Sequence, residues 1–267
     1  MSSIIEDLIA RKIFNNRGDE TIEVDVITTG GFGRVGAPAG KSRGKSEVSY
    51  YPQGGVEQAI KKIDDLIAPE LAGLNADFQQ EIDDTLHEID GTSDFKNIGG
   101  NTAFAISLAN AEAAANSHGL LLFQFLGGSS ANTLPYPLGN CISGGQHARG
   151  KAPSIQEYLA LPHGAESFLE AQTANTLIHK RVGDSLKKKI TSFNGGKSDE
   201  GAWIANVTTD DAFEIMARTC EEVGNELDFE CGFGIDVAAS SFWKPKEQKY
   251  MYENGDKKRD TAEQLEY

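Results

Sequence analysis

Features that would mark a specialised class of protein are scarce in this 267-residue sequence. Its three cysteines are too few, and an odd number, for a disulfide framework, which indicates a reducing compartment. No apolar run approaches the roughly 18 residues that a membrane-spanning helix needs. The first residues, from Met1 to Phe14, mix charged side chains among the apolar ones, unlike the apolar segment of a signal peptide. We therefore expect a cytoplasmic protein without a membrane span.

Positive charge is also in short supply. The sequence has 25 Lys and Arg against 40 Asp and Glu, a net charge of −15. Such a surface repels a phosphate backbone, which argues against nucleic acid as a partner. An anionic ligand would need local cations or a bound metal ion. With 39% hydrophobic residues, the chain can bury two modest cores or one large one.

The first half of the sequence shows strand patterns followed by helix patterns. Apolar and acidic residues alternate over 21–28, and the chain resumes extended over 32–35 after Gly30 and Gly31, which predicts a hairpin. Three helices are predicted next: 56–67, closed by Pro69; one opened by an Asp77 and Gln80 capping box; and 101–118. This order indicates an α+β domain over residues 1–128.

From Leu134 the pattern changes to short apolar strands alternating with helices, which predicts an α/β barrel or a doubly wound sheet over 134–267. Polar residues gather at the predicted strand ends, the positions that face the active site in α/β barrels. They are His147 after the first predicted strand, Gln156 and Glu157 within the second, and Asp236 near the end of the third. The strands are predicted at 136–142, 155–161 and 229–238, and the helices at 165–186 and 209–223.

Two loops contain short sequence motifs that do not reveal a function on their own. Gly40, Lys41 and Ser42 look like the end of a phosphate-binding P-loop, but that motif needs a glycine where Val35 stands, and an apolar helix after the serine. A flexible glycine-rich loop is the favoured interpretation, and nucleotide binding is the alternative. The acidic loop around Glu200 could be an ordinary turn on its spacing alone.

Motifs along the whole chain, taken in order, resemble those of enolases of the archaeal kind. They are Ala10–Gly18, Thr21–Asp25, Leu108–Ala109, Phe125–Gly128, Leu134–Pro137, Gly144–Ala148, Ile155–Tyr158, Asp199–Gly201 and Gly234–Ser240. The resemblance implies an α+β N-terminal capping domain followed by a TIM-like, enolase-type α/β barrel. It also implies a homodimer that is a phosphopyruvate hydratase, a lyase of glycolysis that converts 2-phosphoglycerate to phosphoenolpyruvate with Mg²⁺.

The same resemblance assigns roles to individual side chains. Glu200 is similar to the general acid that helps the 3-hydroxyl leave, and Glu157 belongs to its charge network and to the substrate contacts. His147 and Gln156 resemble further substrate contacts. Asp236 resembles the first magnesium ligand, and Ser42 the serine that closes over a second magnesium ion. Enolase-superfamily sites use a lysine or histidine base with one or two Mg²⁺ ions.

The sequence also predicts that this chain is an N-terminal fragment. A barrel takes about 250 residues, and only about half as many come after Leu134. Thr261 with Gln264 predicts the start of a helix near the last residue. The acids that complete the first metal site and the lysine base implied by the resemblance are absent.

We therefore expect an incomplete barrel that is inactive alone. The alternatives are a non-catalytic enolase-like scaffold protein, a superfamily member that acts on another carboxylate, and a nucleotide-binding P-loop protein.

Overall fold

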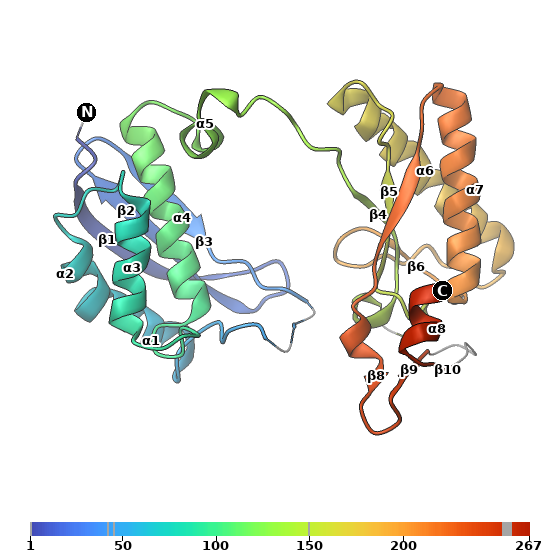
Figure 1. Cartoon of the computed structure of the whole chain (residues 1–267), viewed down its shortest axis with the longest axis horizontal. Helices are drawn as coiled ribbons and strands as arrows, with labels where there is room; N and C mark the ends of the chain where they lie inside the picture. Colours follow the sequence, from blue (N-terminus) through green and yellow to red (C-terminus); the bar gives the residue numbers. More distant parts are fainter. Residues whose placement is uncertain (1, 42, 45, 149, 253–257) are drawn as a thin grey trace. The chain divides into compact units, whose positions relative to one another are not determined.

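The chain forms two compact units, each with its own hydrophobic core. The computed structural model describes residues 2–41, 43–44, 46–148, 150–252 and 258–267. Unit 1 is Met1–Thr133 and unit 2 is Leu134–Tyr267, the blue-to-green and the green-to-red parts of the ribbon (Figure 1).

Unit 1 is built on a three-stranded antiparallel sheet, in the order β1 (Ile5–Phe14), β2 (Glu20–Thr28) and β3 (Phe32–Gly36). The predicted hairpin is confirmed as β2 and β3. The sequence of β1 does not alternate between apolar and polar residues, so the pattern does not predict this strand. Its pairing with β2 shifts register between Ile5 and Asp7, and its exposed face carries apolar residues such as Ile9. The sheet therefore has a mixed outer face and an apolar inner face.

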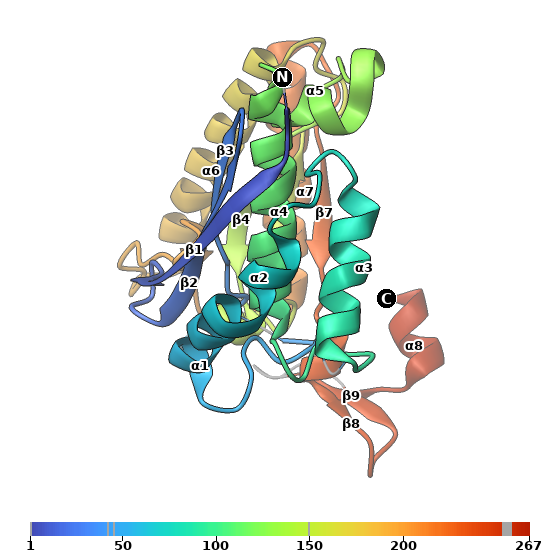
Figure 2. The ribbon, with the colours of Figure 1, turned by 90° about the vertical axis from the view of Figure 1, so that its left-hand side faces the viewer.

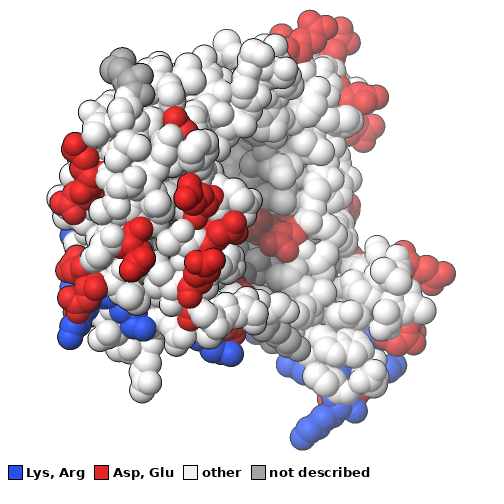
Figure 3. All heavy atoms as spheres, turned by 60° about the vertical axis from the view of Figure 1, so that its left-hand side comes forward, with Lys and Arg blue, Asp and Glu red and all other residues white. Residues whose placement is uncertain are grey.

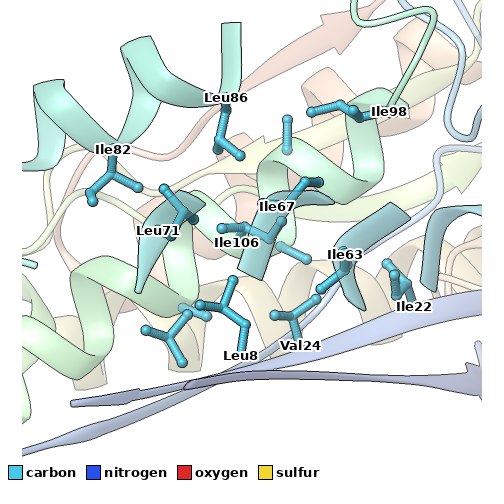
Figure 4. Packing of buried hydrophobic residues seen from close by; sticks show 14 of the residues in the cluster. Leu8, Ile22, Val24, Ile63, Ile67, Leu71, Ile82, Leu86, Ile98 and Ile106 are labelled. Atoms are coloured by element: carbon cyan, nitrogen blue, oxygen red, sulfur yellow. The ribbon is translucent and has the colours of Figure 1, made fainter. Parts of the chain in front are cut away.

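Helices cover the inner face of this sheet (Figure 2). They are α1 (Gly55–Lys62), the π-helical segment η1 (Ile63–Ile67), α2 (Ala68–Leu71) and α4 (Gly100–Ser117), with α3 (Gln79–Asp90) packed against η1 and α4. Two further elements follow α4, namely α5 (Leu122–Gly127), which contacts α4, and the short η2 (Gly128–Ser130). Leu8 and Val24 from the strands meet Ile63, Ile67 and Ile106 from the helices in the core (Figure 4).

Two predicted helix boundaries in unit 1 are wrong. The first helical stretch continues past Pro69 to Leu71, because Pro69 lies in the first turn of α2, where a missing N–H is tolerated. The capping box of Asp77 and Gln80 does not form, since α3 begins after Phe78 without a side-chain cap. Asp77 is instead hydrogen-bonded to His118, whose Nε2 lies 2.8 Å from Asp77 Oδ1.

Unit 2 contains a mixed four-stranded sheet in the order β6 (Trp203–Ile204), β4 (Gly139–Ser143), β5 (Glu157–Leu161) and β7 (Gly232–Asp236). β4 and β6 are parallel, whereas β5 runs antiparallel to both β4 and β7. The long helices α6 (Phe168–Lys189) and α7 (Thr209–Leu227) pack on this sheet and start with capping boxes. Among the described residues the sheet does not close, as an incomplete barrel requires.

A second small sheet ends the chain. It consists of β8 (Trp243–Lys244), β9 (Lys249–Met251) and β10 (Lys258–Arg259), followed by α8 (Thr261–Glu266); the short helices η3 (Gly145–His147) and η4 (Ala239–Ser241) complete unit 2. The predicted capping box of Thr261 and Gln264 is displaced by one residue. Asp260 and Glu263 form it, and Gln264 accepts a hydrogen bond from Tyr252.

The surface reflects the composition. Clusters of Asp and Glu stand out on the face shown in Figure 3, in keeping with the net charge of −15. Within the described parts of the chain, no helix has both the length and the apolar character needed to cross a membrane.

The contact between β3 and α4 yields a testable prediction. A Cβ atom at Gly33 would lie 2.0 Å from the carbonyl oxygen of Ala109 and 2.6 Å from the amide nitrogen of Ala113. Because both are backbone atoms, Gly33→Ala must separate the strand from the helix, and we expect it to lower the free energy of unfolding by about 2–3 kcal/mol. Urea unfolding followed by circular dichroism measures the change. Gly44→Ala, where a Cβ meets nothing within 4 Å, is the matched control; equal effects of the two substitutions would contradict the prediction.

Candidate active site

Three strands of unit 2 bring polar side chains to one edge of the sheet. Ser143 at the end of β4 pairs with Glu157 at the start of β5, and Glu157 pairs with Asp236 at the end of β7. Residues paired in this way lie on the same face of a sheet. The sequence placed Gln156 and Glu157 within a strand. In the structure, the antiparallel β5 starts at Glu157. The first residue of β5 therefore lies between the last residues of β4 and β7.

His147, Glu157 and Glu200 form the centre of the site. His147 Nδ1 lies 3.1 Å from Glu157 Oε1 and 3.2 Å from Glu200 Oε2. The His147 side chain is only 6% exposed and that of Glu157 16%, whereas Glu200 is 39% exposed. One ligand atom from each residue falls within 4.8 Å of the others, a spacing that could also hold a cation.

A glycine loop delivers His147 to this centre. The amide of Gly144 donates to the carbonyl of Gln156, and the amide of Gly145 donates to that of Pro153. A Cβ at Gly144 would lie 2.2 Å from the carbonyl oxygens of Pro153 and Ile155, so only glycine allows this approach. The loop thus fixes η3 against the segment that leads into β5.

A tight turn delivers Glu200. The Gly201 amide donates to the Ser198 carbonyl at 3.0 Å, and Gly201 has a φ of +84°, a value that favours glycine. Asn140 of β4 donates from Nδ2 to Glu200 Oε2 at 3.0 Å, and Ser143 bonds Ser198 at 3.0 Å. Sequence reasoning missed Asn140, although a polar side chain within an apolar strand was the signal that singled out Gln156.

The environment of Glu157 favours its protonated form. Burial, a hydrogen bond with the Glu200 carboxyl group and the negative charges of Glu200 and Asp236 raise the pKa of Glu157 to about 7. Glu157 therefore holds a proton over a wider pH range than an ordinary glutamate, up to near neutral pH. Because the Asn140 amide group can only donate through Nδ2, Glu200 Oε2 is the acceptor of that hydrogen bond. Such a pair can deliver a proton to a bound molecule.

Gln156 and Asp236 form a second polar pair beside this centre. Gln156 is 3% exposed and donates from Nε2 to Asp236 Oδ2 at 3.1 Å, while its buried Oε1 has no hydrogen-bond partner within the described chain. Asp236 Oδ1 accepts from the amide of Ala238, which has the left-handed φ of +46°, unusual for alanine. A buried acceptor next to a carboxylate offers oxygen atoms of the kind that Mg²⁺ binds.

The structure thus brings together five of the six predicted site residues as two neighbouring groups. His147, Glu157 and Glu200 form one group, and Gln156 with Asp236 forms the other. Ser42, and with it the end of the P-loop-like segment, lies outside the described residues.

Comparison with known proteins identifies the family. The family model described as "Enolase, N-terminal domain" matches residues 5–126, and "Enolase, C-terminal TIM barrel domain" matches residues 131–267. The chain belongs to the enolase family. The predicted order of an enolase capping domain followed by an enolase barrel domain is therefore confirmed.

Archaeal enolases are similar over the whole chain. The enolase of Methanothermobacter thermautotrophicus is 50% identical over 267 residues, and that of Methanosphaera stadtmanae 49%; both matches cover 100% of this chain. The enolase of Pyrobaculum aerophilum is 45% identical over 273 residues and 98% of this chain. In each case the match covers 64% of the relative, so the chain spans just under two thirds of their length.

The raised pKa of Glu157 predicts how the stability of unit 2 depends on pH. A carboxyl group with a pKa of 4.5 when unfolded and about 7 when folded stabilises the fold below pH 4.5 relative to higher pH, and that contribution is lost as pH rises to about 7. We expect wild-type stability to fall over this window by on the order of 1–3 kcal/mol more than that of Glu157→Gln.

Urea unfolding at pH 4.5 and pH 8 measures this difference. Tryptophan fluorescence reports unit 2 alone, because both tryptophans, Trp203 and Trp243, lie there. Glu166→Gln, at an exposed position, serves as the control. If the difference in unfolding free energy between wild type and Glu157→Gln is the same at both pH values, Glu157 has an ordinary pKa and the prediction is wrong.

Proposed function

We propose that the protein containing this chain is a phosphopyruvate hydratase. It dehydrates 2-phosphoglycerate to phosphoenolpyruvate in glycolysis and gluconeogenesis and depends on Mg²⁺. Membership of the enolase family supports this function. The observation that carries it is the pair formed by Glu157 and Glu200 beside His147, in which burial and the neighbouring carboxyl groups raise the pKa of Glu157 to about 7. Loss of a hydroxyl group as water needs such a proton donor.

The proposed chemistry balances as an elimination. Glu200 gives its proton to the 3-hydroxyl of 2-phosphoglycerate, the C3–O bond breaks, and water leaves. A base removes the C2 proton, and the electron pair of the broken C2–H bond forms the C2–C3 double bond. Glu157 supports Glu200 as part of the same charge network, and both His147 and Gln156 contact the substrate. The buried Gln156 Oε1 has an acceptor position left for a substrate hydroxyl group.

Asp236 and Ser42 are the proposed magnesium ligands. The carboxylate of Asp236 fits a cation that takes oxygen ligands. When bound, Mg²⁺ would stabilise the negative charge that builds up on the substrate carboxylate as C2 loses its proton. In a protein of net charge −15, a metal ion also offsets the repulsion of an anionic substrate.

We further propose a cytoplasmic homo-oligomer that binds a small phosphorylated carboxylate and no nucleic acid. The cellular location follows from the reaction and from the sparse cysteines. The oligomer rests on the family resemblance alone.

The function is tested with this chain and with a fusion. The fusion joins to Tyr267 the part of the Methanothermobacter thermautotrophicus enolase that lies beyond its matched region. We expect residues 1–267 alone to give no phosphoenolpyruvate, because the implied lysine base is absent from this sequence. We expect the fusion to turn over 2-phosphoglycerate with Mg²⁺, and Glu200→Gln within it to lose at least about 100-fold in kcat.

Glu166→Gln in the same fusion is the control and should keep full activity. Turnover by residues 1–267 alone would contradict the predicted inactivity of this chain. A folded fusion without turnover would overturn the proposed reaction and favour the non-catalytic scaffold.

The magnesium assignment is tested separately in the active fusion. Asp236→Asn keeps the shape of the side chain and its hydrogen-bonding acceptor but removes the charge. We expect it to raise the Mg²⁺ concentration needed for half-maximal activity at least about tenfold, since carboxylates are the strongest ligands that a protein offers this ion. An unchanged Mg²⁺ requirement would place the metal elsewhere.

A further inference from the structure

The Glu200 turn needs support beyond its own hydrogen bonds. Besides the Gly201 bond, the Ser198 amide donates to the Ala202 carbonyl at 2.8 Å, so the turn is closed internally. These bonds define its shape but not its position against β4 and β5. Asn140 and Ser143 hold it from the β4 side, through Glu200 and Ser198 respectively. The opposite side depends on the residues that come after Gly201.

Trp203 anchors that side of the turn to α6. Its indole N–H donates to the carbonyl of His179 at 2.8 Å, and its ring stacks on the His179 ring with centroids 5.0 Å apart and planes 24° apart. Phe193 packs edge-on against the indole, and the Lys197 ammonium lies 4.2 Å from the ring centroid. The aromatic ring is thus enclosed by groups on both sides of the turn.

His179 also reaches the turn itself. Its Nε2 lies 2.9 Å from the carbonyl oxygen of Gly201, the residue directly after Glu200. A carbonyl oxygen can only accept, so Nε2 carries the hydrogen and donates. One imidazole therefore holds the turn through a hydrogen bond at Gly201 and a ring stack at Trp203.

Gly183, one helical turn after His179, leaves the space that the indole occupies. A Cβ at this position would lie 2.7 Å from two carbon atoms of the Trp203 ring. Any side chain there would push the ring, and with it the turn, away from α6. The helix surface is therefore shaped to seat Trp203 next to His179.

We propose that His179 is a positioning residue that sets the location of Glu200 against Glu157 and His147. It contacts neither carboxylate and acts through Gly201 and Trp203. The consequence for catalysis rests on the proposed function, whereas the effect on the turn does not.

Amide hydrogen exchange in the full 267-residue chain tests the effect on the turn. In His179→Ala we expect the Gly201 and Ser198 amides to exchange roughly fivefold faster than in the wild type, the loss of about one hydrogen bond. His179→Gln places an amide N–H near the position of Nε2 and should restore most of the protection. Lys180→Ala, at the exposed neighbouring position on α6, is the control.

Gly183→Ala tests the same anchor from the ring side. We expect the same increase in exchange at Gly201 and Ser198, with a change in Trp203 fluorescence that is read in a Trp243→Phe background. If His179→Ala fails to fold, this variant and the glutamine variant still decide the matter. Unchanged exchange in the variants that fold would overturn the proposal.

The active fusion separates positioning from the reaction. Because misplaced catalytic groups lose rate more than binding, we expect His179→Ala to lower kcat at least about tenfold with KM within about twofold, and His179→Gln to recover it. Faster exchange in a fusion that never turns over would refute the proposed reaction and leave the positioning intact. Full kcat in His179→Ala with unchanged exchange would refute the positioning and leave the reaction intact.

Discussion

The close approach of two carboxyl groups, Glu157 and Glu200, is the constraint on which the rest of the site depends. Their carboxylate oxygens lie within 4.8 Å of each other, so two negative charges there would repel. Burial of Glu157 adds a desolvation cost. The raised pKa of Glu157, the imidazole of His147 and the amide group of Asn140 reduce this cost. Each of these groups comes from a different segment, so the strand register and two loops must be fixed before the pair can exist.

Sheet topology provides that fixed frame. An antiparallel β5 between β4 and β7 puts the start of one strand level with the ends of two others, so Ser143, Glu157 and Asp236 share a row. Residues on strands are held by the ladder hydrogen bonds, whereas Glu200 stands on a turn and needs anchors. The contacts that hold it, from β4 and from α6, therefore matter as much as the acid itself.

The sequence predicted the strand hairpin and the alanine-rich helix from local signals, and the ordered motifs named five residues that the structure brings together. It could not predict the antiparallel course of β5, since a strand pattern does not specify the direction of the strands that pair with it. It missed Asn140 and His179 for a related reason. An isolated polar residue on a strand or helix gains meaning only when folding brings a partner from 60 or 22 residues away.

Stability and chemistry compete most directly at Glu157. A carboxyl group with a pKa of about 7 destabilises unit 2 at neutral pH compared with a neutral amide in its place. The apolar core between the sheet and its two long helices offsets this cost. The acids themselves lie outside that core, at the edge of the sheet. The same raised pKa is what allows a glutamate to hold a proton at neutral pH, so the property that weakens the fold is the one that an acid catalyst requires.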